Sequence, residues 1–286
     1  MQGVLALCSA EIFIHPLPLP QKLFHVKRGC TKAAFHSIQT GNSAPVRVPP
    51  RKVPVHLRLE VERQIKKMLK NGIIRRSTSP WLFPAVFTAK KTGELRICFD
   101  YREPNKLSKR AAYPLPLPDE VQDRIGGATV FSTLDLNNGF WQLPIHPADC
   151  EKTAFSPGPG MGLYEFVCMP FGLTGGPSSF QRMMDHVLDG LPFTMVYLDD
   201  ILVFSRDMAA HHRHLTEVFR RLLYNGLTMR GSKCRIAVSQ IHYLGHVFSA
   251  CGMAPDQCKV EAITLFERPT NAKQLRQFLG LASYYR

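Results

Sequence analysis

The sequence predicts an α+β fold. Segments with helical spacing and segments with strand character follow one another without a regular strand–helix–strand repeat, which disfavours a parallel α/β sheet. The chain has 286 residues, of which 45% are hydrophobic and 20% charged, as in ordinary globular proteins. It carries 36 Lys and Arg against 22 Asp and Glu, a formal net charge of +14. Such an excess commonly serves a polyanion, most often nucleic acid, although an unrelated basic enzyme also fits it.

Cysteine spacing and hydropathy predict an intracellular protein, cytoplasmic or nuclear. The eight cysteines include no C-x-x-C pair, which argues against a zinc site and a secreted disulfide framework. We interpret the histidines at 211, 212 and 214 as a solvated helix face rather than a metal site. No apolar run is long enough to span a membrane, and residues 1–10 lack the basic start of a signal peptide, so no membrane partner is expected.

The chain divides by composition into three parts. Residues 1–54 are predicted to be a poorly ordered arm or linker, because their prolines fix extended backbone and remove hydrogen-bond donors. Residues 55–250 carry regular helix and strand patterns and are predicted to form the main domain. Residues 251–286 contain two further helical stretches.

Periodicity and chain breakers predict the elements of these parts in order. A helix from about residue 57 ends at Asn71-Gly72, and its many Lys and Arg residues indicate either a solvated face or a phosphate-facing surface. Apolar runs at 82–89 and 95–99 predict a hairpin with a basic tip. The remaining expected elements are helices at 119–125, 177–188, 215–224, 256–266 and 271–284, strands at 129–134, 193–198 and 201–204, and a hairpin at 241–248.

The informative feature is Asp199-Asp200, which separates two apolar strands. A tight hairpin normally has Asn-Gly or Asp-Gly there, and two adjacent carboxylates repel each other. A sequence that breaks the local rule inside an otherwise regular hairpin indicates a functional site. Hard carboxylate oxygens suit Mg²⁺. An isolated Tyr-x-Asp-Asp would more often be an acidic surface turn.

A third aspartate strengthens this hypothesis. Asp135 ends the apolar strand at 129–134. If that strand lies beside the hairpin, Asp135, Asp199 and Asp200 converge at one edge of a sheet. Three carboxylates there would require cations, and two metal ions would form the clamp that stabilises the attacking and leaving oxygens in phosphoryl transfer.

Short sequence motifs give more specific information about the chain. They occur in one order along three quarters of the sequence, and they are Gly72-Ile-Ile-Arg75, Ser79-Pro-Trp81, Arg96-Ile-Cys-Phe-Asp100-Tyr-Arg102, Tyr113-Pro-Leu-Pro116, Phe131-Ser-Thr-Leu-Asp135-Leu, Lys152-Thr-Ala-Phe155, Met169-Pro-Phe-Gly-Leu-Thr174, Phe180-Gln181, Tyr197-Leu-Asp-Asp-Ile-Leu202, Ser232-Lys-Cys234, Tyr243-Leu-Gly-His246 and Phe278-Leu-Gly-Leu-Ala-Ser-Tyr-Tyr285. From Met68 to Arg286 the sequence resembles the reverse transcriptase of Ty3/gypsy-type LTR retrotransposon Pol polyproteins.

The resemblance implies a right-hand polymerase fold, with fingers and palm in residues 55–250 and a truncated thumb. Residues 251–286 would then begin the thumb or connection helices. It implies an RNA-directed DNA polymerase that adds deoxynucleotides to a primer 3′-end by a two-metal mechanism. The cofactor would be Mg²⁺, two ions, with Mn²⁺ as a substitute. The partners would be deoxynucleoside triphosphates and an RNA or DNA template with its primer, while ribonuclease H and integrase regions would occur only in a longer polyprotein.

The resemblance also implies roles for individual residues. Asp135, Asp199 and Asp200 match the catalytic, metal-binding carboxylates. The positions that match nucleotide-binding residues are Lys90, Lys91, Arg96, Leu136, Phe140 and Tyr197, with Phe140 as the aromatic ring that crowds the 2′ position of the sugar. The positions that match template- or primer-binding residues are Asp100, Arg102, Pro170, Phe171, Gly172, Leu244, Gly245 and His246.

Two alternatives stay open. Departures from the family pattern, such as Gly175-Gly176, and the end of the chain at Arg286 also fit an inactive retroelement remnant that only binds nucleic acid. Another palm-type polymerase or a nucleotidyl cyclase would share paired aspartates, although Phe140 and the Met169-Pro-Phe-Gly motif disfavour it. A P-loop phosphotransferase is not supported, because the sequence has no G-x-x-x-x-G-K-[ST].

Overall fold

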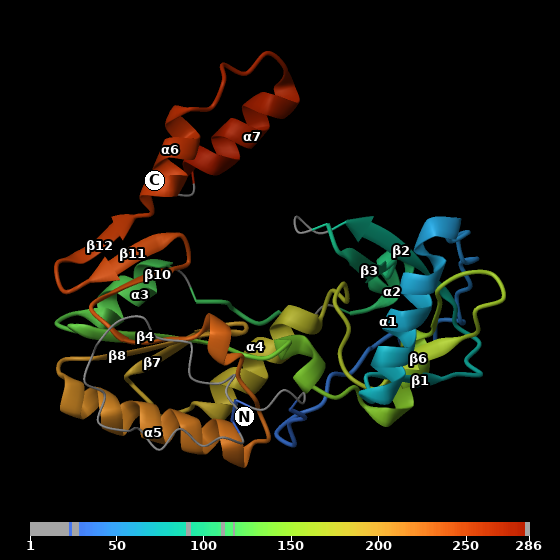
Figure 1. Cartoon of the computed structure of the whole chain (residues 1–286), viewed down its shortest axis with the longest axis horizontal. Coiled ribbons are helices and arrows are strands. Elements are labelled where there is room, and N and C mark those ends of the chain that lie inside the picture. Colours follow the sequence, from blue (N-terminus) through green and yellow to red (C-terminus); the bar gives the residue numbers. More distant parts are fainter. Residues whose placement is uncertain (1–22, 25–28, 90–92, 110–111, 117, 284–286) are drawn as a thin grey trace.

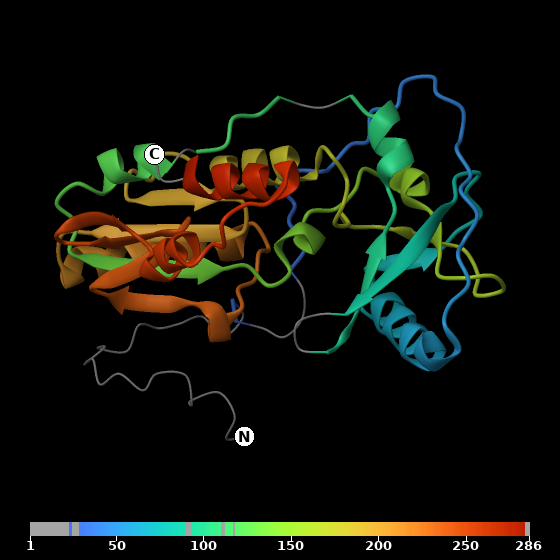
Figure 2. The same ribbon diagram turned by 90° about the horizontal axis from the view of Figure 1, so that it is seen from above.

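The chain forms two lobes and a helical extension in this computed structural model (Figure 1). The structure describes residues 23–24, 29–89, 93–109, 112–116 and 118–283. The lobes lie at opposite ends of the long axis, and Figure 2 shows the same separation from above. We call the lobe with the helices α4 and α5 the palm and the other lobe the fingers.

The palm is built on a four-stranded antiparallel sheet. In spatial order its strands are β7 (Thr194–Tyr197), β8 (Asp200–Ser205), β4 (Val130–Asp135) and β9 (Arg235–Val238). The residues of β8 alternate between two cores: Ile201 and Val203 join the core on one face, and Leu202 and Phe204 join the other. Both faces of the sheet are therefore covered, which explains why β8 is apolar at every position from 201 to 204.

Two sets of elements cover these faces. On one side α4 (Gly176–Val187) and α5 (Met208–Tyr224) contribute buried residues to the larger core. On the other side lie α3 (Pro118–Ile125) and a three-stranded antiparallel sheet. The strands of that small sheet are β10 (Gln240–Tyr243), β11 (His246–Ser249) and β12 (Gly252–Pro255).

The fingers contain a five-stranded mixed sheet with an aromatic centre. Its strands, in spatial order, are β1 (Ile74–Arg76), β6 (Tyr164–Phe166), β5 (Phe155–Ser156), β2 (Phe83–Ala89) and β3 (Leu95–Phe99), and its helices are α1 (Arg58–Lys70) and α2 (Arg102–Leu107). The rings of Phe99, Phe155 and Phe166 lie 4.5 to 5.3 Å apart, centroid to centroid. Short 3₁₀ helices complete the chain, namely Val55–Leu57, Gly139–Gln142, Pro147–Thr153 and Gly231–Lys233.

The segment 29–54 packs against both lobes, unlike the unpacked arm that its prolines predict. Thr31 donates its backbone N–H to Gln142 of the palm at 2.8 Å. Farther along, the backbone N–H of Ile38 donates to the carboxylate of Asp149 at 3.0 Å. His36 is 3% exposed and forms an isolated parallel bridge with Ile145. Proline content indicated extended backbone correctly, but extended backbone also pairs with neighbouring strands and loops. Residues 1–22 lie outside the described part.

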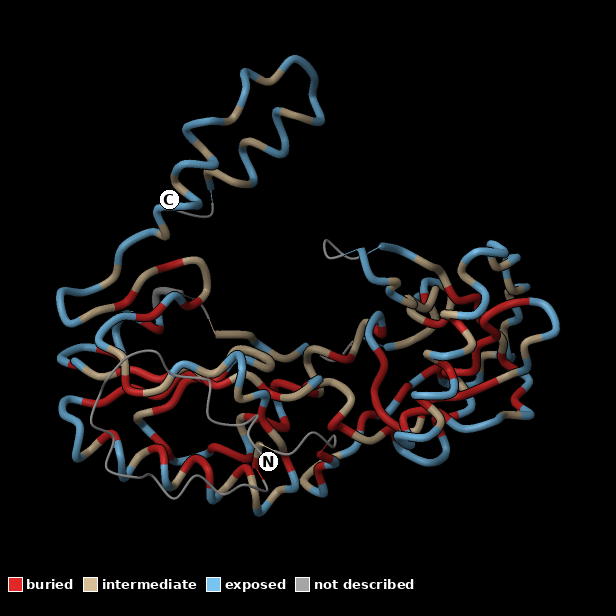
Figure 3. Tube along the Cα trace, in the orientation of Figure 1, coloured by how far each residue is buried: buried red, intermediate tan, exposed pale blue. Residues whose placement is uncertain are grey.

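The two C-terminal helices differ from the other α-helices in their burial. Helices α6 (Gln257–Thr264) and α7 (Ala272–Ala282) project from the palm side of the molecule (Figure 1) and contain no buried residue. In Figure 3 this extension is coloured only as exposed and intermediate, while the strands of both lobes run through buried segments.

The expected elements are present, with three corrections in the palm. Helix α5 begins at Met208 rather than at the expected residue 215, and Asp207 caps its first turn. The turn between β7 and β8 consists of Leu198 and Asp199, and Asp200 already pairs with Tyr197, so the turn lies one residue earlier than predicted. The histidines on α5 are not all solvated: His211 is 1% exposed. Its ring nitrogens lie 2.7 Å from the hydroxyl of Ser132 and 2.8 Å from that of Ser205, so the expected solvated face points partly into the core. No helix among the described residues is long and apolar enough to cross a membrane.

Candidate active site

The three aspartates meet where the palm strands end. Asp135, the last residue of β4, lies directly opposite Asp200, the first residue of β8. Directly opposite residues of an antiparallel pair project to the same face of a sheet. Asp199 stands in the turn beside them, and its carbonyl accepts the backbone N–H of Leu136 at 3.3 Å. The expected convergence of the three residues at one edge of the sheet is therefore present in the fold.

Electrostatics at this edge are unfavourable for three negative charges. Burial first, and then the charges of its neighbours, raise the pKa of Asp200 above its ordinary value. Burial and the nearby Asp135 likewise raise the pKa of Asp199. Lys233 offsets part of this repulsion, because its Nζ lies 2.9 Å from the carboxylate of Asp135. The site is thus short of positive charge, which is the condition in which a cation binds.

The three aspartate carboxylates are suitable ligands for a divalent cation, although their side chains are not arranged as a complete coordination site. Within the described ranges, no group of three or more His, Cys, Asp or Glu side chains is arranged so that it could hold a metal ion. The chemistry of three adjacent carboxylates nevertheless matches Mg²⁺, which takes oxygen ligands and completes its shell with water and phosphate.

Gly139 is a site residue that sequence reasoning missed. A Cβ atom at this position would lie 2.9 Å from the Cβ of Asp199 and 3.1 Å from the ring of Phe180. Contacts below 3.0 Å require a neighbour to move, so glycine lets the 3₁₀ turn after β4 approach the acidic turn. The signal in the sequence is Asn137-Asn138-Gly139, a turn-favouring run that begins two residues after Asp135.

An aromatic group borders the acidic edge on the side toward the fingers. The ring of Phe140 lies 5.2 Å from Phe171 and 5.3 Å from Phe180, measured between centroids. Phe171 is 45% exposed, and the guanidinium carbon of Arg96 lies 6.0 Å from the centre of its ring. Phe140 and Arg96, from different lobes, are therefore brought to the same place by contacts with Phe171.

Among the predicted template-binding residues, Asp100 and Arg102 are paired with each other. Arg102 donates two hydrogen bonds to Asp100, at 2.7 and 2.6 Å, and this pairing lowers the pKa of the Asp100 carboxyl. Pro170 is buried. The carbonyl of Gly172 accepts a hydrogen bond of 2.7 Å from the side-chain amide of Asn105. The guanidinium of Arg102 is thus engaged by Asp100 in this structure.

The hairpin between β10 and β11 lies over the acidic turn. Leu244 and Gly245 form its two-residue loop with φ of +47° and +73°, as a type I′ turn requires. His246 is 7% exposed, and its Nδ1 lies 3.0 Å from the carbonyl of Leu244. At the base of this loop, the hydroxyl of Tyr243 donates to the backbone carbonyl of Asp200 at 3.2 Å. That hydrogen bond links the hairpin to the acidic edge.

The remaining predicted nucleotide-binding residues differ in their exposure. The side chain of Leu136 is 1% exposed and belongs to the larger core. Tyr197 is half-buried against the smaller core. Lys90 and Lys91 lie outside the described residues.

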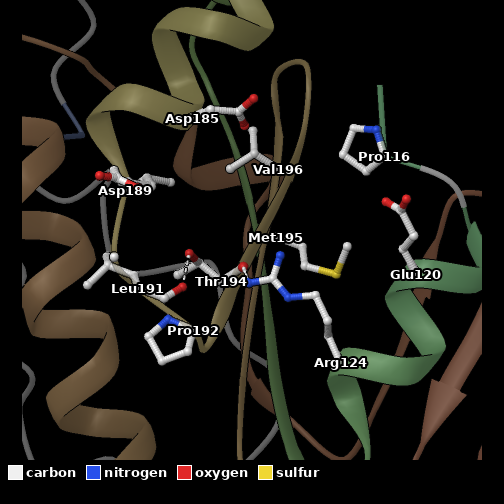
Figure 4. Close-up of a pocket in the computed structure, with 12 residues that line it drawn as sticks. Pro116, Glu120, Arg124, Asp185, Asp189, Leu191, Pro192, Thr194, Met195 and Val196 are labelled. Atoms are coloured by element: carbon white, nitrogen blue, oxygen red, sulfur yellow. Dashed lines mark hydrogen bonds between the residues drawn. The ribbon is translucent and has the colours of Figure 1, made fainter. Parts of the chain in front are cut away.

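A pocket of about 380 Å³ lies away from the acidic edge. Figure 4 shows its walls, with Glu120 and Arg124 on α3 facing residues of α4 and of β7. The guanidinium of Arg124 donates to the carbonyl of Thr194 at 3.0 Å. None of the three aspartates at the acidic edge lines this pocket.

Known proteins resemble this chain in sequence. A family model described as reverse transcriptase (RNA-dependent DNA polymerase) matches residues 88–248. The retrovirus-related Pol polyprotein from transposon 297 of Drosophila melanogaster is 35% identical over 263 residues, which is 90% of this chain and 25% of that protein. The transposon Tf2-3 polyprotein of Schizosaccharomyces pombe is 34% identical over 225 residues, which is 78% of this chain and 17% of that protein. The chain therefore spans a quarter or less of the length of these relatives.

Solved structures resemble it in fold. The foamy viral protease-reverse transcriptase dRH in complex with double-stranded DNA superimposes with a TM-score of 0.83 at 25% identity, covering 91% of this chain and 46% of that one. The same viral protein in complex with an RNA/DNA hybrid gives a TM-score of 0.79 at 25% identity, covering 91% of this chain and 35% of that one. With the sequence matches, this similarity means that the chain belongs to the reverse transcriptase family and has its relatives among the Pol polyproteins of retrotransposons, including those of the Ty3/gypsy type.

Proposed function

We propose that this chain is an RNA-directed DNA polymerase, which adds deoxynucleotides to the 3′-end of a primer on an RNA or DNA template. The observation that carries the proposal is the pairing of Asp135 with Asp200 beside the turn of Asp199. In such a reaction no covalent nucleophile is needed from the protein, so catalysis rests on positioning and on electrostatic stabilisation.

In this proposal Asp135, Asp199 and Asp200 hold Mg²⁺, with Mn²⁺ as a substitute, in a two-metal arrangement. When bound, the ions would supply positive charge to the attacking and leaving oxygens. The raised pKa values of Asp199 and Asp200 support this assignment, since neighbouring positive charge would favour their ionised forms. Lys233 would have to share or release the carboxylate of Asp135.

Nucleotide selection is assigned to the aromatic group. We propose that Phe140 crowds the 2′ position of the incoming sugar, because its ring is held between Phe171 and Phe180 and resists displacement. Arg96, held over Phe171, would bind the triphosphate together with Lys90 or Lys91. Tyr197 would contribute to the nucleotide site through its side chain and Leu136 through its backbone, because the Leu136 side chain is buried.

Template and primer are assigned to the surfaces on either side. The net charge of +14 supports binding of a nucleic acid backbone. Asp100, Arg102 and the turn of Pro170, Phe171 and Gly172 would lie near the template. Leu244, Gly245 and His246 would hold the primer end, a role supported by the bond from Tyr243 to Asp200.

We propose a division of the chain that matches these roles. Residues 55–250 would form the fingers and palm, and residues 251–286 would begin the thumb or connection helices. Ribonuclease H and integrase regions would belong to a longer polyprotein.

Primer extension on an RNA template with deoxynucleotides and Mg²⁺ tests the proposal. Asp199→Asn should abolish extension, whereas Asp123→Asn, which removes an exposed carboxylate of α3, should extend normally. Ribonucleotides offered in parallel should be rejected, and Phe140→Ala should accept them more readily. Incorporation of ribonucleotides by the unaltered chain at the same rate would instead support another palm-type polymerase.

The alternative is a remnant that binds nucleic acid without catalysis. A folded chain that binds a primer–template duplex in a salt-dependent way but incorporates no nucleotide would support this alternative and exclude the proposed activity.

A further inference from the structure

Two glutamine side chains lie fully buried beside the acidic edge. Gln142, in the 3₁₀ helix after β4, and Gln181, on α4, are both 0% exposed. A buried primary amide is costly unless both its N–H groups and its oxygen are paired. Both glutamines meet this condition, and each does so with the backbone of a segment that carries an aspartate of the site.

Gln181 holds the acidic turn. Its Oε1 accepts the backbone N–H of Leu198 at 2.7 Å, and its Nε2 donates to the carbonyl of Val196 at 2.9 Å. The second N–H of the amide donates to the carboxylate of Asp185, also at 2.9 Å. Asp185 in turn accepts the hydroxyl of Tyr113 at 2.6 Å. One side chain thus bonds the strand before the turn and the turn itself.

The turn requires such support. Leu198 has a φ of +55°, a conformation that is unfavourable for a residue with a Cβ atom. Leu198 lies outside the β7–β8 ladder, so the opposite strand does not pair its N–H. The hydrogen bond to Gln181 therefore stabilises the unfavourable backbone conformation of Leu198, the residue directly before Asp199.

Gln142 holds the segment after Asp135 in the same way. Its Oε1 accepts the N–H of Thr228 at 2.8 Å, and its Nε2 donates to the carbonyls of Thr228 and Asn137 at 2.8 and 2.9 Å. Asn137 lies two residues after Asp135, and its own N–H donates to the carbonyl of Thr228 at 3.0 Å.

We propose that Gln142 and Gln181 are positioning residues, which fix the backbone on which Asp135 and Asp199 stand. The kinetic part of this inference rests on the proposed function, and the structural part does not. Only an amide offers two donors and an acceptor in one plane, so a carboxylate or a thioether of similar size cannot reproduce these bonds.

Gln181→Met tests the proposal, because methionine keeps the volume of the side chain and removes its hydrogen bonds. We expect amide hydrogen exchange at Leu198 to accelerate by about tenfold or more, as loss of one buried hydrogen bond implies. In single-nucleotide addition, the catalytic rate should fall by about ten- to a hundredfold with little change in the KM for the deoxynucleotide, as expected when transition-state geometry alone is lost. Gln142→Met should accelerate exchange at Asn137 and Thr228.

Thr194→Val is the matched control. It removes a buried hydrogen bond of 2.9 Å, from the Thr194 hydroxyl to the carbonyl of Leu191, at the other end of β7. If Thr194→Val lowers the catalytic rate as much as Gln181→Met, or if exchange at Leu198 is unchanged in Gln181→Met, the positioning role is wrong.

A second variant covers the case in which Gln181→Met does not fold. Gln181→Asn keeps the amide but shortens the side chain by one methylene, so that it can no longer reach both Val196 and Leu198. The remaining amide can still donate to a neighbour, so fewer buried polar groups are left unpaired than in Gln181→Met. We expect faster exchange at Leu198 in this variant as well, and unchanged exchange there would overturn the proposal.

The two proposals fail in different ways. If the unaltered chain incorporates no nucleotide, the proposed function fails, while the exchange measurements still decide whether the glutamines position the acidic segments.

Discussion

Helices α5 and α7 have similar amphipathic sequence patterns but lie in different surroundings in the fold. Both are amphipathic, and both begin at a side-chain cap, Asp207 for α5 and Asn271 for α7. Helix α5 buries five residues against the palm sheet, whereas α7 buries none of its residues and leaves Leu279 54% exposed. Amphipathic spacing therefore predicts that a helix has an apolar face, but whether the face is covered depends on what the fold places opposite it.

The largest expected difference concerns the apolar faces themselves. Leu222→Ala on α5 removes a side chain that is fully buried and should lower the free energy of unfolding by about 2–5 kcal/mol. Leu279→Ala on α7 should change it by less than about 0.5 kcal/mol. Urea unfolding followed by circular dichroism measures both. Equal losses would mean that α7 is packed in solution, and the contrast between the two helices would disappear.

Acid should destabilise the palm and leave α7 unaffected. Burial lowers the pKa of His211 from its ordinary value of 6.5 to about 4. The unfolded chain therefore takes up this proton first, and stability falls as the pH decreases from about 6.5 toward 4. At pH 5 the loss from His211 should be about 2 kcal/mol relative to pH 7.

Unfolding curves at pH 7 and pH 5 measure this loss, and His211→Gln should show a smaller pH dependence than the unaltered chain. His36, whose pKa is also lowered to about 4, contributes in both proteins and cancels in the difference. Helix α7 contains no histidine, so its amide protection should not change over this range. An identical pH dependence in His211→Gln would contradict the assignment.

The N-cap residues of α5 and α7 test the same difference between the two helices, with a smaller expected effect on stability. Asp207 accepts the N–H of Ala210 at 2.7 Å, and Asn271 accepts that of Gln274 at 2.9 Å. Replacement of either by Ala should cost about 1 kcal/mol of helix stability. For Asp207→Ala the cost should appear in global unfolding. For Asn271→Ala it should appear only as faster amide exchange within α7, and a shift of the global transition would show that α7 unfolds together with the palm.

The smallest expected effect has the opposite sign. Because burial and repulsion raise the pKa of Asp199, the ionised carboxylate destabilises the folded palm at neutral pH. Asp199→Asn should therefore stabilise the metal-free protein by up to about 1 kcal/mol, a small value because solvent screens a partly exposed group. This gain should decrease as the pH falls and the aspartate becomes neutral. Thermal unfolding with a chelator checks it, and a loss of stability would mean that Asp199 makes favourable contacts.

Much of the fold could be predicted from the sequence. Long periodic segments and clear breakers predicted α1 and the hairpin of β2 and β3 with bounds close to those found, and they predicted the end of α5 but not its start. The sequence did not reveal β1, β5 and β6, because two or three residues carry no periodicity and pair only within the assembled fingers sheet. The packing of segment 29–54 was missed for a similar reason, since its partners, such as Gln142 and Asp149, are distant in the chain.

The candidate site divides in the same way. The meeting of Asp135 with Asp199 and Asp200 could be predicted, because Asp135 ends one apolar strand and Asp199-Asp200 connects two others. The ion pairs of Arg102 with Asp100 and of Lys233 with Asp135 could not be predicted. They depend on which side chains lie close together in the folded protein. The close approach of Gly139 to Asp199 depends on backbone placement within a few tenths of an ångström, which no local pattern encodes.

The pairing of Asp135 with Asp200 has a consequence for how sequences of this kind can diverge. Side chains alternate between the two faces of a strand. Deletion or insertion of one residue in β4 or β8 would therefore turn one aspartate away from the other, and the apolar residues of that strand would point into the opposite core. Substitutions among Ile, Leu, Val and Phe leave this parity unchanged. Lineages that keep the pair should therefore vary freely in the composition of these two strands while the number of residues in them stays constant, and length changes should accumulate in the connections between them.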